Sequence, residues 1–498
     1  MNSHRTNLII AFFLGALTVL GYAPFYLFPI PILALALLFR AWRKSGTARE
    51  AARLGFFFGL GFFGAGVSWI YVSLHDFGAM PMPIAVLVTL LFCAYLALFP
   101  ALAGGLLKKI NPRHPALWAL CIAALWMFAE CLRGMLFTGF PWLAVGYTQV
   151  PTSYLSGYAP VVGVYGVSFV LAIAAALMCL WFELGFRALR VVLPFSAIFI
   201  VGFGLQQIAW TQPTGEPVSV SLLQGNISQD SKWRKDRIVH SMETYAKLVE
   251  ESRGQIIIAP ETALPMFHDE VPAAYLARLS GHARQYDSDL LIGMAEYAPT
   301  GSGSEYYNAM FSLGVSGEQK YRKHHLVPFG EFVPLRPLLG WIVSILHIPM
   351  SDFSRGGLDQ QPLSLAGQKV AVDICYEDVF GEEIIRQLPA ATLLVNVSND
   401  AWFGRSIGPQ QHLQISQTRA LETGRYMLRA TNTGVTAIID ERGVVVQEAA
   451  VFVATALHGN AQGRGGATPY VRWGNLPVLL LAGLIVLLSV ALRFRRAR

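Results

Sequence analysis

Three residues that lie far apart in this sequence have the side chains of a covalent catalytic centre: Glu261, Lys323 and Cys375. A thiol becomes an effective nucleophile when a base removes its proton or a cation stabilises the thiolate. A carboxylate can act as that base, and an ammonium group can stabilise the negative charge that develops on an attacked carbonyl oxygen. A glutamate, a lysine and a cysteine together therefore indicate nucleophilic catalysis by the thiol.

The runs beside these residues predict strands whose ends would bring the three side chains together. Glu261 follows the apolar run QIIIAP, Lys323 lies in YRKHHLVPFGEFVPL, and Cys375 follows KVAVDI. An open α/β sheet builds its site at the ends of its strands. A helix predicted at 379–387 would add partial positive charge near the backbone of Cys375.

The three residues belong to a region, 213–462, in which short β-branched or apolar runs alternate with helical patterns. That alternation predicts an α/β domain with a largely buried sheet. The predicted strands are 218–224, 255–260, 289–297, 308–314, 369–374, 392–398, 426–432 and 435–440. The predicted helices include 234–252, 271–285, 379–387 and 409–424.

The rest of the chain has the composition of a membrane protein. Hydrophobic residues make up 54% of the sequence and charged residues only 14%, against about a quarter charged in average soluble chains. The apolar residues collect in blocks of about 20, the length that crosses a bilayer. The eight predicted spans are 8–25, 28–42, 55–74, 82–106, 115–133, 160–182, 190–209 and 476–492.

Basic residues fall in alternate loops between these spans, which predicts the topology. The loops 22–28 and 75–81 contain no Lys or Arg, whereas the intervening loops and the C-terminal tail are basic. The positive-inside rule therefore places both termini in the cytoplasm and 213–470 on the opposite side, the periplasm of a bacterium. The net charge of +7 follows from this topology, so no nucleic-acid partner is expected. The predicted domains are 1–212 with seven spans, 213–462 with the catalytic residues, and 463–498 with the last span and a basic tail.

The cysteines and histidines give no sign of a disulfide or metal site. Cys375 is the only cysteine in the exported domain, where it has no disulfide partner. The adjacent histidines His324 and His325 do not have the spacing of zinc ligands. No metal and no cofactor are therefore expected. The other four cysteines lie in predicted spans, where a free cysteine is usually a small buried hydrophobe: Cys93, Cys121, Cys131 and Cys179.

Four motifs, in their order along the chain, resemble the Glu–Lys–Cys motifs of the nitrilase, or carbon–nitrogen hydrolase, superfamily: APETALP, KHHLVPFGEFVPL, CYED and NVSNDAWFG. The form HLVPFGEFVPL, with seven spans before the domain and one after it, resembles the bacterial apolipoprotein N-acyltransferases. This resemblance covers essentially the whole chain. It implies a polytopic α-helical membrane protein with about eight transmembrane helices that carries an α/β nitrilase-like α-β-β-α sandwich.

The resemblance also implies roles for particular residues. Glu261 would be the general base, Lys323 the oxyanion stabiliser and Cys375 the nucleophile. The implied supporting residues are Glu331, Tyr376 and Glu377. The implied substrate-binding residues are Trp233, at the lipid entrance, with Asn308 and Trp402.

The reaction that the resemblance implies is a two-step acyl transfer by a monomeric enzyme of the inner membrane. The thiol would take the sn-1 acyl chain of a phospholipid, typically phosphatidylethanolamine, as a thioester. The α-amine of a diacylglyceryl-modified cysteine at the N-terminus of an apolipoprotein would then take the chain. The eight spans and the apolar stretch 337–350 independently favour a lipid substrate, because that stretch could enter the membrane surface or line an acyl-chain cleft.

Two other functions remain open on the sequence alone. A membrane-anchored amidase or acyl hydrolase would use the same three residues and release the acyl group to water. A transporter with an exported binding domain would carry polar residues along several spans. One ionisable pair, Glu130 and Arg133, is evident in the spans, three residues apart and near the exported side. That pair could contact a lipid headgroup or be structural.

Overall fold

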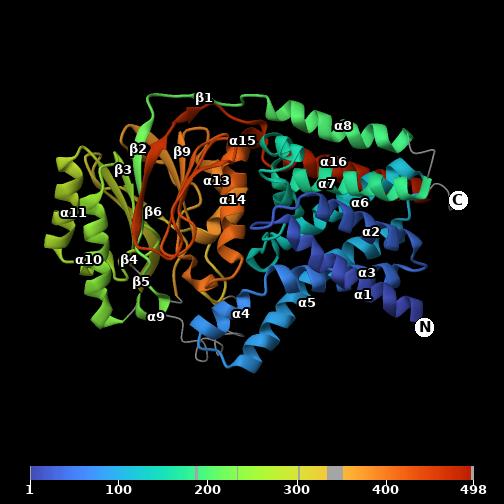
Figure 1. Ribbon diagram of the computed structural model, residues 1–498, viewed down its shortest axis with the longest axis horizontal. Helices are drawn as coiled ribbons and strands as arrows, with labels where there is room; N and C mark the ends of the chain where they lie inside the picture. The colour runs from blue at the N-terminus through green and yellow to red at the C-terminus, as the bar shows by residue number, and fades with distance from the viewer. Residues whose placement is uncertain (1, 185–188, 233, 301–302, 334–351, 495–498) are drawn as a thin grey trace. The chain divides into compact units, whose positions relative to one another are not determined.

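The computed structural model describes residues 2–184, 189–232, 234–300, 303–333 and 352–494 (Figure 1). The chain forms two compact units. The first comprises Met1–Tyr71, Met82–Ala209 and Arg472–Arg498, and the second comprises Val72–Pro81 and Trp210–Val471. The stretch 337–350, which was predicted to contact lipid, lies outside the described residues.

A helix lies at each of the eight places where a membrane span was predicted. These helices are α1 (Asn2–Thr18), α2 (Pro29–Lys44), α3 (Ala48–Gly66), α5 (Met82–Ile110), α6 (Pro115–Arg133), α7 (Ala159–Leu184), α8 (Leu189–Gln206) and α16 (Leu476–Phe494). Five of the described helices are long and apolar enough to cross a membrane, namely α5 to α8 and α16. A sixth span results if α3 is joined to Ile70–Phe77, across a bend of 58°.

The two helices nearest the N-terminus are shorter than the about 20 residues that cross a bilayer. Helix α1 has 17 residues and helix α2 has 16, and α2 ends with Arg43 and Lys44. Small residues bring the helix backbones of the first unit close together. At Gly61 of α3, for example, an added Cβ would lie 1.9 Å from the carbonyl oxygen of Phe12 in α1. Such close approach through small residues is typical of packed membrane helices.

The second unit contains two six-stranded sheets. The first has the order β13 (Thr455–Ala461), β2 (Val218–Gln224), β3 (Ile256–Ile258), β4 (Asp289–Thr300), β5 (Gly303–Gly314) and β6 (Lys320–Arg322). The second has the order β12 (Val445–Glu448), β11 (Ala437–Ile439), β10 (Met427–Thr431), β9 (Leu393–Ser398), β8 (Gln368–Ile374) and β7 (Leu363–Leu365). Strands β2, β3 and β4 are parallel, as are β8, β9 and β10, and antiparallel strands flank each set.

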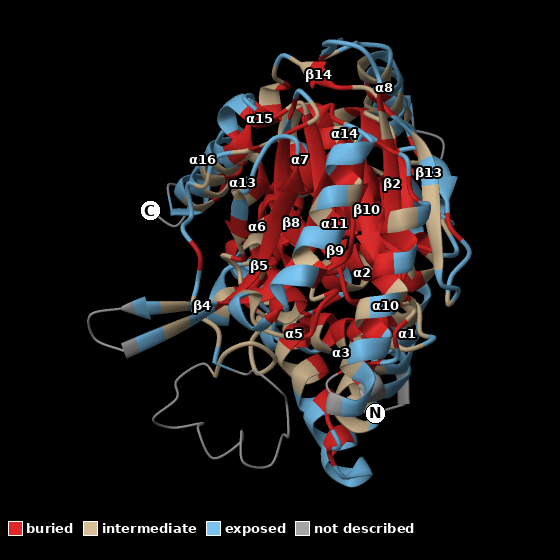
Figure 2. Cartoon of the chain, turned by 90° about the vertical axis from the view of Figure 1, so that its left-hand side faces the viewer, coloured by how far each residue is buried: buried red, intermediate tan, exposed pale blue. Residues whose placement is uncertain are grey.

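Apolar side chains that point to alternate faces along the strands form three buried layers. Ile256 and Ile258 of β3 and Val372 of β8 belong to one core between the two sheets. Ile257 packs instead with residues of α10 (Lys235–Glu251) and α11 (Ala273–Gln285), while Ala371 packs with residues of α14 (Gly408–Thr423). Neighbouring side chains of a strand point to opposite faces, so both faces of each sheet are buried. Figure 2 shows the buried strands behind the exposed outer faces of α10 and α11.

The resulting layers are helix, sheet, sheet and helix (Figure 1). This is the predicted α-β-β-α sandwich in a chain with apolar membrane helices, so the predicted fold class is confirmed. The remaining elements are short: α4 (Ile70–Val72), α9 (Gln229–Lys232), α13 (Gly381–Ile384), α15 (Pro469–Trp473), and the strand pair β1 (Gln212–Pro213) and β14 (Arg464–Gly465).

The helix predicted at 379–387 does not form as one element. A 3₁₀ turn, Cys375–Val379, is followed by the four-residue helix α13 and a second 3₁₀ turn. Phe380 separates the first turn from α13 because its backbone angles, φ −106° and ψ 74°, are not helical. The expected helix dipole beside Cys375 was therefore wrong, since four residues align too few peptide groups.

Gly293 on β4 allows the segment after β3 to pack against the sheet. An added Cβ would lie 2.5 Å from the amide nitrogen of Thr262 and 2.6 Å from the carbonyl oxygen of Pro260. We expect Gly293→Ala to destabilise the second unit by about 1–3 kcal/mol and to displace Glu261, because backbone atoms cannot yield as a flexible side chain can. Thermal unfolding in detergent and lipid-dependent acylation measure the two effects.

Gly281→Ala is the matched control. Gly281 lies on the exposed face of α11 and no atom would lie within 4 Å of its added Cβ. This substitution should raise stability by roughly 0.5–1 kcal/mol, as expected for glycine within a helix. Equal changes in thermal stability for Gly293→Ala and Gly281→Ala would contradict the conclusion that Gly293 is needed for the segment after β3 to pack against the sheet.

Candidate active site

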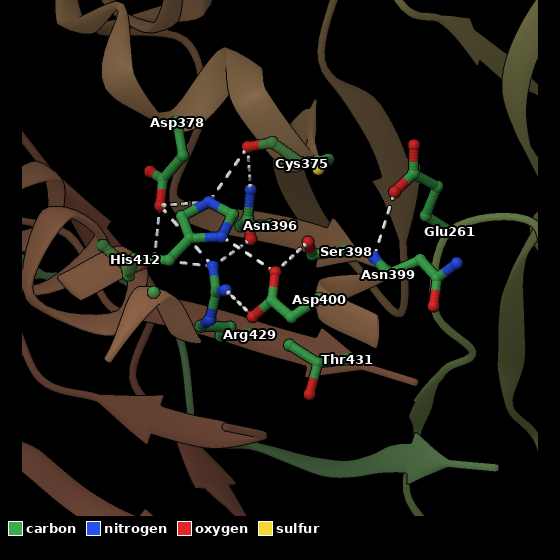
Figure 3. A network of polar contacts seen from close by, with 12 residues as sticks. Glu261, Cys375, Asp378, Asn396, Ser398, Asn399, Asp400, His412, Arg429 and Thr431 are labelled. Carbon is green, nitrogen blue, oxygen red and sulfur yellow. Dashed lines mark hydrogen bonds and ion pairs between the residues drawn. The ribbon is translucent and has the colours of Figure 1, made fainter. Parts of the chain in front are cut away.

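Cys375 lies on a strained turn at the end of β8. Its φ of 56° is in the left-handed region, which costs an L-residue about 1–2 kcal/mol. The side chain remains partly accessible, whereas the strand before it is buried. The carbonyl oxygen of Cys375 faces His412 and Asn396, and Figure 3 shows these contacts. Strain of this kind persists only where surrounding contacts impose it, and it is typical of functional positions.

Glu261 follows β3 and is 7% exposed. Its Oε1 accepts a hydrogen bond of 2.7 Å from Asn308 Nδ2, and its Oε2 accepts one of 3.0 Å from the backbone N–H of Asn399. In Figure 3 Glu261 lies on the side to which the sulfur of Cys375 points. The carboxylate is thus oriented by two donors from other strands of the sandwich.

Lys323 follows β6 and is only 1% exposed. Its Nζ lies 3.4 Å from Glu261 Oε1 and 2.9 Å from the carboxylate of Glu331. Burial opposes the charge, but Glu331, Glu261 and the thiol of Cys375 raise the pKa of Lys323 above its usual range. Lys323 is therefore a permanent cation held between two acids.

Asn308 joins these two acids. Its Nδ2 donates to Glu261 Oε1 at 2.7 Å and to Glu331 Oε1 at 2.9 Å, and its carbonyl oxygen accepts from the Lys323 N–H at 2.8 Å. Glu331 also accepts from the N–H of Val327 at 2.8 Å. Asn308, which the resemblance placed among the substrate-binding residues, thus lies in the polar cluster around Lys323.

The thiol of Cys375 is strongly biased toward its neutral form. Burial raises its pKa first, the negative charges of Glu261 and Asp400 raise it further, and Lys323 and the Ser398 hydroxyl lower it. The net result is a pKa above the usual range. A thiol in this state needs a base during the reaction, and Glu261 is the carboxylate that acts on it most strongly.

Glu377 ties the segment after Lys323 to the strand before Cys375. Its carboxylate accepts hydrogen bonds from the backbone N–H groups of Ile374 at 2.7 Å, His324 at 2.6 Å and His325 at 3.0 Å. The hydroxyl of Tyr321 donates to it at 3.1 Å. Burial raises the pKa of Glu377 to about 7, although the backbone N–H groups and Lys323 act in the opposite direction.

Of the three remaining predicted residues, Tyr376 and Trp402 lie among the described residues. Tyr376 is 8% exposed and its ring contacts Phe380, with centroids 5.3 Å apart. Trp402 follows β9; its carbonyl oxygen accepts from Ser73 Oγ at 2.8 Å and its ring lies 6.2 Å from that of Phe77. Trp233 lies outside the described residues.

The structure adds groups that the sequence interpretation missed. Lys232 is 3% exposed, and its Nζ lies 3.4 Å from the carbonyl oxygen of Glu261. Burial lowers the pKa of Lys232 to about 8, against the opposing effects of Glu261 and Cys375. Asn399 contributes the N–H that orients Glu261. Its place in the motif NVSNDAWFG was a signal that could have identified it.

The carboxylates of the site form hydrogen bonds and ion pairs with other residues of the protein. Among the described residues, no group of three or more His, Cys, Asp or Glu side chains is arranged to hold a metal ion. The carboxylates of Glu261 and Glu331 face Lys323 and Asn308 instead. The chemistry available is proton transfer, nucleophilic attack by sulfur and charge stabilisation by an ammonium group.

Comparison with known families first defines the class of each unit. Residues 219–457 match the carbon–nitrogen hydrolase family, and residues 14–177 match the family described as the apolipoprotein N-acyltransferase N-terminal domain. The protein thus combines a carbon–nitrogen hydrolase domain with a membrane domain.

The relatives identify the family more closely. The chain is 61% identical over 481 residues to the apolipoprotein N-acyltransferase of Nitrosomonas europaea, covering 97% of this chain and 96% of the relative. It is 46% identical to the enzymes of the same name from Chromobacterium violaceum, covering 98% and 94%, and Methylococcus capsulatus, covering 97% and 95%. The chain therefore belongs to the apolipoprotein N-acyltransferase family, as its motifs predicted, and is a multi-pass bacterial membrane acyltransferase.

The electrostatics of the site predict how Cys375 reacts with a small alkylating reagent. Because its pKa is raised, the thiolate fraction should rise about tenfold per pH unit, so alkylation should accelerate from pH 6 to 9 without a plateau. Lys323→Met should slow alkylation at each pH, since Lys323 lowers the pKa.

Iodoacetamide labelling of the peptide that contains Cys375, quantified by mass spectrometry, provides the measurement. Cys375→Ala gives the background. A plateau below pH 8 in the wild type, or unchanged labelling of Lys323→Met, would show that the assigned electrostatic environment is wrong.

Proposed function

We propose that this protein moves an acyl chain from a phospholipid, through a thioester on Cys375, to the N-terminal amine of a lipid-modified apolipoprotein. The observation that supports it most is the Glu261–Lys323 contact of 3.4 Å, on the side to which the sulfur of Cys375 points (Figure 3). Membership of the apolipoprotein N-acyltransferase family supplies the substrate classes. In this proposal Glu261 is the general base, Lys323 the oxyanion stabiliser and Cys375 the nucleophile.

The first step forms the thioester. Glu261 takes the proton of the Cys375 thiol while the sulfur attacks the ester carbonyl carbon at the sn-1 position. Lys323 stabilises the oxyanion of the tetrahedral intermediate, which is where a fixed ammonium group has its largest effect. The intermediate collapses with cleavage of the carbon–oxygen bond. The departing glycerol oxygen receives the proton from Glu261, and a lysophospholipid leaves.

The second step uses the same groups in the reverse direction. The α-amine of the diacylglyceryl-modified cysteine attacks the thioester carbonyl, and Glu261 takes a proton from the amine. Cleavage of the carbon–sulfur bond gives the amide, and the sulfur of Cys375 recovers its proton from Glu261. An amide is more stable than a thioester, so this step runs downhill. The kinetics of such a sequence are ping-pong.

The supporting residues have distinct roles in this proposal. Glu331 holds Lys323 in place, and Asn308 orients Glu331 and Glu261 with one amide group. Glu377 fixes the segments that carry Lys323 and Cys375. Three aromatic residues would shape the substrate path: Trp233, Tyr376 and Trp402.

The proposed location follows from the distribution of basic residues. The enzyme would lie in the inner membrane as a monomer, with 1–212 and the last span of 463–498 in the bilayer. The catalytic domain, 213–462, would be periplasmic and both termini cytoplasmic. Phosphatidylethanolamine would be the usual acyl donor.

Exposure to phosphatidylethanolamine should add one acyl mass to the intact wild-type protein, on the peptide that contains Cys375, and hydroxylamine should remove it. Glu261→Gln and Lys323→Met should each slow this acylation, by roughly 100- to 10,000-fold for the base and about 100- to 1,000-fold for the charge-stabilising group. Each variant should remain folded in detergent. Intact-mass kinetics measure the rates.

Cys375→Ala should take no label and should not acylate a lipopeptide amine. Joint replacement of the other four cysteines, Cys93, Cys121, Cys131 and Cys179, should leave acylation unchanged. Transfer of the label to a lipopeptide supports the acyltransferase. Release of the label as free fatty acid in the presence of the lipopeptide would instead indicate a hydrolase. Acyl transfer by Cys375→Ala would overturn the assignment.

Topology is tested with reporter fusions at residues 45, 110, 300 and 498. The positive-inside rule predicts cytoplasmic signals at 45, 110 and 498 and a periplasmic signal at 300. A cytoplasmic signal at residue 300 would reverse the proposed orientation of the catalytic domain.

A further inference from the structure

A buried group of charged side chains lies beneath the turn that carries Cys375 (Figure 3). We name it the buried charge cluster, and its members are Asp378, Asp400, His412 and Arg429. All four are at most 1% exposed. Arg429 Nη2 contacts Asp400 Oδ2 at 2.8 Å, and His412 Nδ1 contacts Asp400 Oδ1 at 2.9 Å. Asp378 lies 3.8 Å from His412 and 3.6 Å from Arg429.

The cluster reaches the nucleophile at its carbonyl oxygen. His412 Nε2 lies 3.1 Å from the carbonyl oxygen of Cys375. Asn396 Nδ2 adds a second, longer contact of 3.3 Å to the same oxygen. The Ser398 hydroxyl donates to Asp400 Oδ1 at 2.6 Å. The backbone of Cys375 is therefore connected to Asp400 through His412.

The contacts of His412 fix the direction of its ring. A carbonyl oxygen can only accept a hydrogen bond, so Nε2 is the donor where it faces Cys375. Nδ1 faces the carboxylate of Asp400 at 2.9 Å, and Arg429 holds that carboxylate from the other side. The ring is therefore held between Asp400 and the carbonyl oxygen of Cys375.

The contact with His412 bears on the strained conformation of Cys375. The cost of the left-handed φ at Cys375 must be offset by contacts that exist only in that conformation. The His412 contact is one of these, because it fixes the direction of the carbonyl group of the strained residue.

We propose that His412, oriented by Asp400, is a positioning residue that clamps the carbonyl oxygen of Cys375 and so keeps the thiol directed toward Glu261. His412 does not touch the reacting atoms. The inference rests on the proposed role of Cys375 as the nucleophile. It assigns to the buried charge cluster a task in catalysis beyond the stability of the sandwich.

Two substitutions of His412 separate the clamp from simple packing. His412→Met fills similar space without a donor, whereas His412→Gln keeps a neutral N–H donor. We expect His412→Met to lower the kcat for acyl transfer about 100-fold with little change in KM, since a displacement of about 1 Å at the reacting group has this effect. His412→Gln should recover about tenfold of that loss.

Gln387→Met is the matched control. Gln387 is buried, and its Nε2 donates at 2.9 Å to the carbonyl oxygen of Val372, on the same strand and three residues before Cys375. The control therefore also removes a buried side-chain donor to a backbone carbonyl of β8. Its kcat should stay within about threefold of the wild type even where its thermal stability falls as far as that of His412→Met.

Each outcome decides the inference. Equal losses of kcat in His412→Met and Gln387→Met would reduce the cluster to a structural role, and equal losses in the Met and Gln variants of His412 would show that the N–H donor to Cys375 does not contribute to kcat. If His412→Met does not fold, wild-type kcat in His412→Gln would overturn the clamp by His412 and a loss of about tenfold would support it. Retained transfer by Cys375→Ala would instead overturn the proposed function itself.

Discussion

The attraction between one buried ammonium group and two buried carboxylates determines the architecture of this site. Lys323 has almost no contact with solvent, so its charge is tolerated only because Glu261 and Glu331 lie within 3.4 Å. Such a triad gives little net stability, because the desolvation of three charges offsets most of the attraction. In the proposed mechanism its value lies in preorganisation, because the charges need no rearrangement when an oxyanion forms. The loops that follow β3 and β6 must therefore meet at one place.

The same constraint explains why so many backbone groups serve the site. Each acid still has acceptor positions after Lys323 is satisfied, and a buried acceptor without a donor is costly. The amide of Asn308 and the backbone N–H groups of Asn399 and Val327 fill those positions. The N–H of Asn399 comes from the second sheet, so the two sheets must pack in one register for Glu261 to be oriented. Packing of the sandwich core and orientation of the acid thus depend on each other.

Part of this arrangement could be predicted from the sequence. The fold class followed from the alternation of apolar runs and from motif resemblance. Glu261, Lys323 and Cys375 were selected because their side chains together suit nucleophilic catalysis, lie near predicted strand ends and belong to the resembling motifs. The prediction of a helix at 379–387 was wrong because apolar spacing does not reveal the non-helical backbone of Phe380. His412 and Arg429 were missed because their importance depends on contacts with Asp400 across the sheet. Isolated His and Arg residues in a helical or strand pattern carry no local sign of such contacts.

The carboxylate of Glu377 has a mechanical consequence for the catalytic cycle. It accepts hydrogen bonds from the backbone N–H groups of His324 and His325, which follow Lys323, and from that of Ile374, which precedes Cys375. The ammonium group of Lys323 and the thiol of Cys375 are thereby fixed to each other as one rigid body. No hinge can operate between these two segments without breaking several hydrogen bonds in a buried place. In the proposed mechanism, exchange of a long acyl donor for a bulky protein acceptor must therefore use movements of other segments, while the distance between ammonium and sulfur stays constant from the first half-reaction to the second.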